Sequence, residues 1–198
     1  MTIAACTLLG YLLGSLPCSL WLARWLSRSD LRLVGDGNPG AANAWKAGGW
    51  RIGIPALFLD VAKGAAAPAV ARTVFDLHSW ALFPIALSPV LGHVASPWLR
   101  WHGGKGIAST FGVWSALTYW VVPTGFGLLL ALLLLIQSVA AWTVIFALLG
   151  TLALLVALRS EPYLIAIFLV NALLLVWTHR EGLRVRPRFG LYSRRERS

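Results

Sequence analysis

Charged side chains are scarce in this sequence. Only 12% of its 198 residues are charged and 58% are hydrophobic, whereas a soluble domain carries about 25% charged residues. So few charges cannot cover a surface that faces water. A bilayer span requires about 20 mostly apolar residues, and the runs 128–136, 142–158 and 163–178 meet or approach that length. The composition therefore predicts an integral membrane protein.

The small number of cysteines and the lack of alternating apolar residues narrow the class of membrane protein further. The chain has two cysteines, Cys6 and Cys18, which cannot form a disulfide framework or a cysteine metal cluster. The apolar runs also lack the alternation of a transmembrane β-barrel. Because a spanning backbone must satisfy its own hydrogen bonds, helices are the remaining solution. The sequence predicts an all-α polytopic membrane protein, with residues 1–198 in a single domain and without a linker or repeat.

The apolar segments fit about seven spans. Lysines and arginines gather in residues 26–51, in residues 99–105 and after residue 179, where the tail includes Arg194, Arg195 and Arg197. Seven spans put these basic segments on one side, which is the cytoplasm by the positive-inside rule. The N-terminus is then outside and the C-terminus is cytoplasmic, where the tail arginines contact anionic lipid. The expected spans are 3–25, 52–72, 79–98, 106–122, 124–138, 141–158 and 162–178.

The span count has an alternative. The fourth and fifth expected spans are short, and we expect Pro123 to form the turn between them, so five or six spans are also consistent with the sequence.

The first segment could pass for a signal peptide. We interpret it as a span because it lacks a positive n-region and its cations follow it.

The loop after the first expected span combines glycines with Asp36 and Asn38. Glycines allow sharp turns and allow a ligand to approach backbone N–H groups. Asn43 and Lys46 are three residues apart, so they share a face if a short helix begins near Pro39. An ordinary polar loop is the alternative, but rigid scaffolds commonly carry functional sites on such loops. The glycines are Gly35, Gly37 and Gly40.

A second glycine-rich loop surrounds Lys105 and directly precedes an apolar helical run. The N–H groups at the start of a helix attract anions, and the helix dipole adds to this attraction. The lysine supplies a full positive charge, so the loop is a candidate phosphate cradle. It lacks the spacing of a Walker A loop, and a tight turn with a topology-setting lysine is equally consistent. The flanking glycines are Gly103, Gly104 and Gly106.

Other polar residues lie within or at the ends of expected spans. Asp60 and Lys63 are three residues apart in the second span. Because charges in a membrane are costly and usually paired, they either neutralise each other or orient the first loop. Ser138 lies between two spans, and His179 ends the last one, both on the expected cytoplasmic side. A lone histidine is more often structural, although its pKa near 6.5 suits proton transfer.

These motifs resemble, in order and over nearly the whole chain, those of the bacterial acyl-phosphate:glycerol-3-phosphate acyltransferases. The family's D-I-R-x-x-G-S-G-N-x-G-A-T-N-x-x-R motif is similar to residues 30–46, and its D-x-x-K-G element is similar to residues 60–64. The family's G-H and K-G-G-K-G-V-A-T elements are similar to Gly92-His93 and to residues 103–109. Its third-motif serine and C-terminal H-R fall on Ser138 and on His179-Arg180.

The resemblance implies a seven-helix, multi-pass enzyme of the bacterial inner membrane that serves phospholipid biosynthesis. Such an enzyme transfers a fatty acyl group from acyl phosphate to glycerol 3-phosphate, releasing lysophosphatidic acid and phosphate. It uses no metal, cofactor or acyl-CoA, and its partners are the two substrates and membrane lipid, with no nucleic acid. The implied catalytic residues are Lys105, His179, Ser138 and Asp36. The implied substrate-binding residues are Asn38, Asn43, Lys46, His93, Gly103, Gly104, Gly106, Asp60 and Lys63.

The sequence departs from the family pattern at several polar positions. The family's serine in G-S-G-N is Asp36 here, and a carboxylate repels a nearby substrate phosphate unless a cation or proton intervenes. The family's arginine is Lys46, which keeps the charge without the bidentate fork, and the asparagine of its last motif is Gly182. Alternative hypotheses are therefore a divergent member with another acceptor, and a non-catalytic protein that binds phosphate or lipid. A transporter is less consistent, because its polar groups would lie at the midplane of the membrane.

Overall fold

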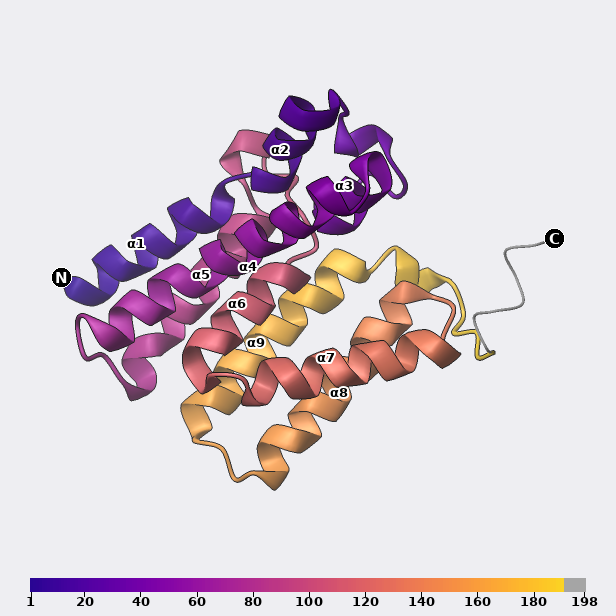
Figure 1. The fold of residues 1–198 in the computed structure, drawn as a ribbon. Coiled ribbons are helices and arrows are strands. Elements are labelled where there is room, and N and C mark those ends of the chain that lie inside the picture. The colour runs from indigo at the N-terminus through magenta and orange to yellow at the C-terminus, as the bar shows by residue number, and fades with distance from the viewer. Residues whose placement is uncertain (191–198) are drawn as a thin grey trace. The chain divides into compact units, whose positions relative to one another are not determined.

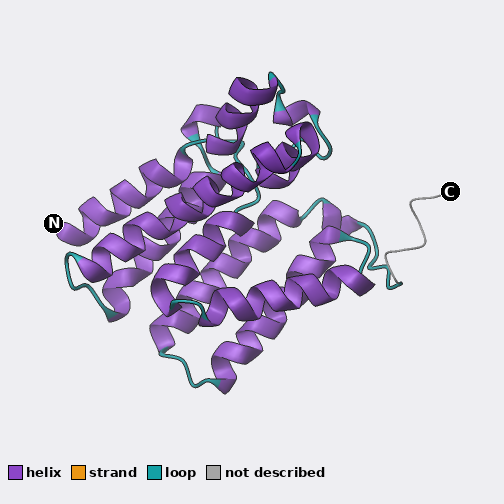
Figure 2. Cartoon of the chain, in the orientation of Figure 1, coloured by secondary structure: helices purple, strands orange, loops and turns teal. Residues whose placement is uncertain are grey.

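The computed structural model describes residues 1–190, and every regular element in that range is a helix (Figure 1, Figure 2). This result confirms the predicted all-α class. The chain divides into two compact units, the first from Met1 to Leu117 and the second from Thr118 onward. The expected cytoplasmic arginines Arg194, Arg195 and Arg197 lie outside the described residues.

The first unit contains the two glycine-rich loops. The loop at residues 28–40 joins the second helix to the third, and the loop at residues 100–106 precedes the sixth helix. The elements are α1 (Thr2–Ser15), α2 (Cys18–Ser27), η1 (Leu31–Leu33), α3 (Ala41–Gly48), α4 (Trp50–Thr73), η2 (Ser79–Ala81), α5 (Leu82–Val94), η3 (Pro97–Leu99) and α6 (Ile107–Thr118).

The first expected span, residues 3–25, is mostly apolar, but its helix is broken in the middle. Leu16 is extended, with φ −63° and ψ 122°, and Pro17 precedes the first residue of α2. Proline has no N–H to donate and disfavours the helical conformation of the residue before it. The break therefore leaves the Leu16 carbonyl available to a side chain from another helix.

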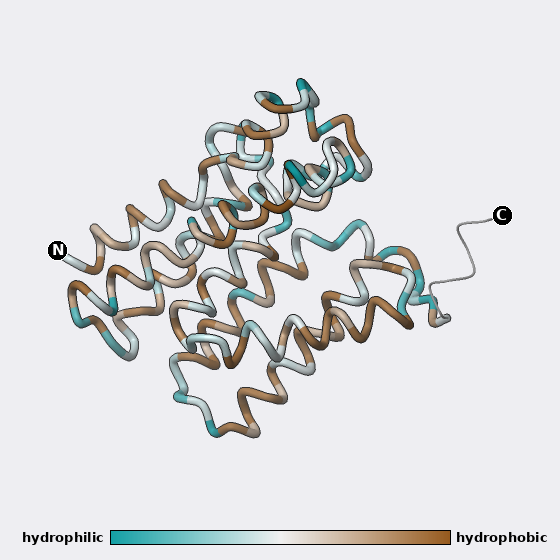
Figure 3. The backbone as a smooth tube through the Cα atoms, in the orientation of Figure 1, coloured by the Kyte–Doolittle hydropathy of each residue, from teal (hydrophilic) through white to brown (hydrophobic). Residues whose placement is uncertain are grey.

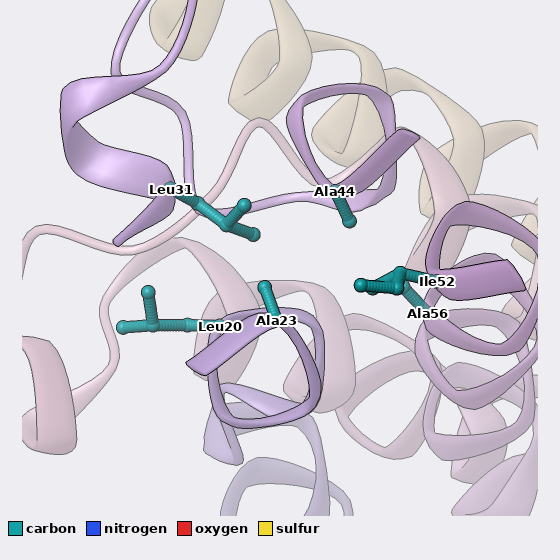
Figure 4. Close-up of a cluster of buried hydrophobic side chains, with 6 residues drawn as sticks. All are labelled: Leu20, Ala23, Leu31, Ala44, Ile52 and Ala56. Carbon is teal, nitrogen blue, oxygen red and sulfur yellow. The ribbon is translucent and has the colours of Figure 1, made fainter. Parts of the chain in front are cut away.

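The helices that carry the first loop are held by a small hydrophobic cluster, shown in Figure 4. The cluster joins α2, η1, α3 and α4, and half of its members are alanines, so the helices approach one another closely. This packing fixes the position of α3, which follows the loop. The buried members are Leu20, Ala23, Leu31, Ala44, Ile52 and Ala56.

Glycines bring other helices of the first unit into backbone contact. A Cβ atom added to Gly14 would meet the backbone of Pro89, and one added to Gly64 would meet the backbone of Ser109. Small residues at such crossings are typical of helix packing in membranes. Gly64 directly follows Lys63, so this close approach places the charged middle of α4 beside α6.

The second unit contains three longer helices and a short one. Figure 3 shows mainly apolar colouring along α8 and α9, with polar colouring in the loops. The C-terminal segment returns to the end of α7, where Gln137 and Phe189 form an antiparallel bridge. The elements are α7 (Val121–Ile136), α8 (Ala140–Ala157), α9 (Pro162–His179) and η4 (Gly182–Arg184).

Five helical segments of the described chain are long and apolar enough to cross a membrane. They are Thr2–Ser27, Trp50–Thr73, Ser79–Leu99, Ala140–Ala157 and Pro162–His179. The other two expected spans are the shorter helices α6, with 12 residues, and α7, with 16. At about 1.5 Å per residue, α6 is only about 18 Å long. All seven expected segments are therefore helical, while the count of seven spans and the orientation of the termini stay predictions.

The turn between α6 and α7 differs from the prediction. We expected Pro123 to form it, but the helix ends at Thr118 and the turn is at Tyr119 and Trp120. Pro123 lies in the first turn of α7. Proline is tolerated there because the first N–H groups of a helix have no intrahelical partner.

Candidate functional site

The two glycine-rich loops meet through an ion pair. The Lys105 ammonium lies 2.7 Å from Oδ2 of Asp36, although the two residues are 69 positions apart. The other carboxylate oxygen, Oδ1, accepts hydrogen bonds from Nδ2 of Asn43 at 2.8 Å and from the backbone N–H of Asn38 at 3.3 Å. The structure thus brings four of the predicted site residues together.

The conformation of the first loop depends on its glycines. Gly35 and Gly37 have φ values of 59° and 74°, which side-chain-bearing residues rarely adopt. Asn43 lies in the first turns of α3 and is buried, and its Nδ2 also donates to the Asn38 carbonyl at 3.0 Å. A Cβ added to Gly35 would lie 2.5 Å from Asn43 Oδ1 and 2.8 Å from Lys46 Nζ. Asn43 and Lys46 therefore share one face of α3, as the sequence predicted.

The second loop is attached to the end of α5. The N–H groups of Gly103 and Gly104 donate to the carbonyls of Val94 and His93, at 2.9 and 3.0 Å. Gly106 has φ 85° and directly precedes α6. Two N–H groups that the sequence suggested for a phosphate cradle thus already have partners within the protein. The charge of Lys105 is the part of the predicted cradle that reaches the first loop.

Gly104 is expected to tolerate no side chain. An added Cβ would meet the ring of His93, including Cδ2 at 3.0 Å and Cε1 at 3.1 Å. We expect Gly104→Ala to displace Lys105 and to destabilise the protein by about 1–3 kcal/mol, as overpacking does. Thermal unfolding in detergent measures this loss. In the double variant Gly104→Ala/His93→Ala the clash is relieved, so a loss equal to that of Gly104→Ala would contradict the explanation.

Asp60 and Lys63 form a buried ion pair behind the loops. Their side chains are 2% and 7% exposed, and Lys63 Nζ lies 2.8 Å from Asp60 Oδ1. Lys63 also donates to the carbonyl of Leu16 at 2.6 Å, and Ser19 Oγ donates to Asp60 Oδ2 at 2.7 Å. The two charges therefore neutralise each other and also hold α4 to both sides of the break in the first span. This result combines both hypotheses for the pair.

His93 is buried between this ion pair and the second loop. Its Nδ1 lies 3.9 Å from Asp60 Oδ1, which is too far for a hydrogen bond, and has no hydrogen-bond partner within residues 1–190. His93, Asp60, Lys63, Ser96 and Gly104 contribute to the wall of a cavity of about 10 Å³. Such a volume accommodates about one water molecule. His93 thus lies directly against the loop that carries Lys105, on the side of the buried ion pair.

Ser138 and His179 belong to the second unit. The Ser138 N–H donates to the carbonyl of Arg188 at 3.0 Å, and Oε1 of the neighbouring Gln137 accepts the N–H groups of Val139 and Arg188. The C-terminal segment therefore fixes the loop that carries the serine. His179 is buried and its Nδ1 lies 2.7 Å from the Leu175 carbonyl, which selects the tautomer with a proton on Nδ1.

Two contributions to the site were missed in the sequence, the Ser19 hydroxyl and the Leu16 carbonyl. Both contact the buried ion pair, from either side of the helix break. Pro17 was a signal for the break, because proline interrupts a helix. No local pattern predicts that the Leu16 carbonyl accepts a hydrogen bond from Lys63, 47 residues further along the chain.

The ionisation of Asp36 is controlled by its neighbours. Burial raises its pKa, but hydrogen bonds from Lys105 and Asn43 outweigh burial and lower the pKa to about 2. Because the pKa is depressed, the ion pair persists above the ordinary carboxyl range and is lost as the pH falls through about 2. We therefore expect the ¹³C resonance of the Asp36 carboxyl to stay constant from about pH 5 to 8. In Lys105→Met its midpoint should rise, and an unchanged midpoint would contradict the role of the lysine.

The fold and the site define a polytopic helical membrane protein in which charged and amide side chains meet on paired glycine-rich loops. A family model described as glycerol-3-phosphate acyltransferase matches residues 4–185. A curated glycerol-3-phosphate acyltransferase of Thermus thermophilus is 41% identical over 93% of this chain and 92% of its own length. One from Deinococcus radiodurans is 36% identical over 93% and 91%. The chain therefore belongs to the glycerol-3-phosphate acyltransferase family, which confirms the resemblance seen in the sequence.

Solved structures agree with this assignment. Two crystal structures of PlsY (YgiH), an integral membrane glycerol 3-phosphate acyltransferase, match this chain with TM-scores of 0.80 and 0.83 and sequence identities of 28% and 27%. Each match covers 93% of this chain and 91% of PlsY. The first is a glycerol 3-phosphate form and the second is a lysophosphatidic acid form. Together with the apolar helices, these matches establish a multi-pass membrane protein.

Proposed function

We propose that this protein acylates glycerol 3-phosphate, with acyl phosphate as the donor, and releases lysophosphatidic acid and phosphate. The names of the curated relatives and the two forms of PlsY support the acceptor and the product. The observation that carries the proposal is the cluster in which Lys105, Asn43 and Lys46 approach the glycine-rich first loop. Such a group of cations and amides is suited to a phosphate monoester.

The chemistry needs little more than positioning and charge stabilisation. The 1-hydroxyl of glycerol 3-phosphate attacks the acyl carbonyl carbon, a new ester C–O bond forms, and the bond to the phosphate oxygen breaks. Because acyl phosphate is already activated, cations that stabilise the developing negative charge make the main contribution. Lys105 and Lys46 are the proposed cations, with Asn38 and Asn43 as hydrogen-bonding partners of the acceptor.

The hydroxyl proton also needs an acceptor. His179 is the proposed candidate, because a proton held on Nδ1 by the Leu175 carbonyl leaves Nε2 as the basic nitrogen. Ser138 is the proposed hydrogen-bond donor to the reacting groups. Asp60, Lys63 and His93 are proposed to act indirectly, because they are buried behind the loops.

The membrane completes the proposed site. An apolar acyl chain is most stable within the hydrocarbon region, while both phosphate groups require the polar loops. We propose that the protein lies in the bacterial inner membrane, with seven spans, the N-terminus outside and the loops on the cytoplasmic side. The basic residues of the loops support this orientation.

A turnover assay with a panel of acceptors tests the proposal. Purified protein receives palmitoyl phosphate with glycerol 3-phosphate, glycerol or another phosphorylated alcohol, and both phosphate release and lipid product are measured. We expect lysophosphatidic acid and phosphate in equal amounts with glycerol 3-phosphate. Phosphate release that does not depend on any acceptor would contradict an acyltransferase. A preference for another acceptor would favour the divergent-member hypothesis, for which the carboxylate of Asp36 is the specific observation.

A further inference from the structure

The carboxylate of Asp36 pairs with the ammonium of Lys105, the cation that is proposed to bind the substrate phosphate. Its Oδ2 lies 2.7 Å from Lys105 Nζ, which is the distance expected of a charge-assisted hydrogen bond between an ammonium and an oxyanion. The two side chains are 50% and 36% exposed, so a soluble anion can reach the pair. A phosphate oxygen and this carboxylate oxygen would therefore compete for the same ammonium.

The carboxylate is held in this position by the loop itself. Asn43 Nδ2 and the Asn38 N–H both donate to Oδ1, which leaves Oδ2 directed at Lys105. Gly35 and Gly37, with their positive φ values, form the turn that contains Asp36. Asn43 is buried and cannot easily move away. This support distinguishes the pair from an ordinary exposed salt bridge between two flexible side chains, which contributes little.

We propose that Asp36 is an affinity-setting residue, an internal carboxylate that competes with phosphate ligands for Lys105. The inference rests on the proposed function, in which Lys105 binds the phosphate of the acceptor. A bound phosphate must displace the carboxylate or accept a like charge at close range. Asp36 therefore raises the KM for glycerol 3-phosphate and weakens inhibition by inorganic phosphate, which is the second product of the proposed reaction.

The competition has a distinct kinetic signature. Inorganic phosphate and glycerol 3-phosphate meet the same carboxylate, so its removal strengthens the binding of both. The change appears in KM and in the inhibition constant for phosphate, whereas kcat changes less, because in the bound complex the carboxylate is already displaced. A residue that only held the loop together would show the opposite pattern, with weaker binding after its removal.

The test compares Asp36→Asn and Asp36→Ser with the wild type. Asparagine keeps the size of the side chain and removes its charge, while serine removes both. We expect inorganic phosphate, titrated calorimetrically without any acyl donor, to bind each variant on the order of tenfold more tightly. Asp76→Asn is the matched control, because Asp76 is exposed, pairs with His78 and follows the opposite end of α4. Equal or weaker phosphate binding in both Asp36 variants would overturn the inference.

A measurement on the wild-type protein covers the case in which the variants fold poorly. Inorganic phosphate at saturation should shift the ¹³C resonance of the Asp36 carboxyl, because Lys105 leaves it for the ligand. An unshifted resonance would overturn the inference.

The binding tests are also independent of turnover. If phosphate binds the Asp36 variants more tightly but no acyl transfer is found, the inference holds and the proposed function fails. If acyl transfer occurs with an unchanged KM in the variants, the inference fails and the proposed function holds.

Discussion

Replacing Lys105 with methionine is expected to lower kcat/KM for glycerol 3-phosphate by roughly 10²–10³-fold, the effect of removing one preorganised stabilising group. Methionine keeps most of the apolar stem and removes the ammonium that meets Asp36. The substrate phosphate then loses a cation and faces a carboxylate that no longer has its counter-charge. Both changes weaken substrate binding and the stabilisation of charge in the transition state.

Steady-state kinetics with palmitoyl phosphate measure this loss. Arg100→Gln is the matched control, because Arg100 belongs to the same basic segment, is exposed and carries the same charge. We expect the control to retain most of the activity. Equal losses in the two variants would show that the positive field of the segment matters and that the individual ammonium does not. Full activity of Lys105→Met would exclude the proposed phosphate site.

A second substitution separates the lost attraction of Lys105 from the repulsion by Asp36. In Lys105→Met/Asp36→Asn the unpaired carboxylate is removed together with the lysine. We expect this double variant to recover part of the binding of glycerol 3-phosphate, because the repulsion is gone while the attraction is still absent. Residues in contact give such non-additive results, and the double-mutant cycle measures their coupling.

Much of the fold could be predicted from the sequence because the apolar runs leave few alternatives. A continuous run such as residues 142–158 has to satisfy its backbone within a membrane, and it forms α8 at Ala140–Ala157. Local breaks were harder to place. Pro17 does interrupt a helix, whereas Pro123 does not, because it falls in a first turn where no N–H is missed. The same residue type has opposite effects at positions that the sequence alone did not distinguish.

The site could be predicted in its parts but not in its contacts. Motif order identified the glycine-rich loops, and spacing placed Asn43 and Lys46 on one helix face, which the structure confirms. The meeting of Asp36 with Lys105 depends on how distant segments pack, and no local pattern encodes it. From the sequence, a carboxylate at position 36 is compatible with a phosphate ligand only if a cation or proton is nearby. The structure shows that this cation is Lys105.

Replacing Asp60 with asparagine is expected to destabilise the protein by about 3–5 kcal/mol, because it leaves a buried lysine without its counter-charge. The Lys63 ammonium would keep the Leu16 carbonyl as a neutral partner, which cannot balance a full charge. Ser19 would lose the carboxylate to which it donates. The break in the first span and the middle of α4 are joined at this point, so the loosening should reach the loop at Asp36 as well.

Thermal unfolding in detergent measures the destabilisation, and the double variant Asp60→Asn/Lys63→Met supplies the control. Removing both charges removes the unpaired ammonium, so the double variant is expected to be more stable than Asp60→Asn alone, as for other buried pairs replaced by apolar groups. If the double variant is less stable than the single one, the carboxylate does not act through Lys63. A recovered stability without recovered activity would separate the two roles of the pair: neutralising charge within the helices, and holding the first span at Leu16 so that the loop at Asp36 stays in place.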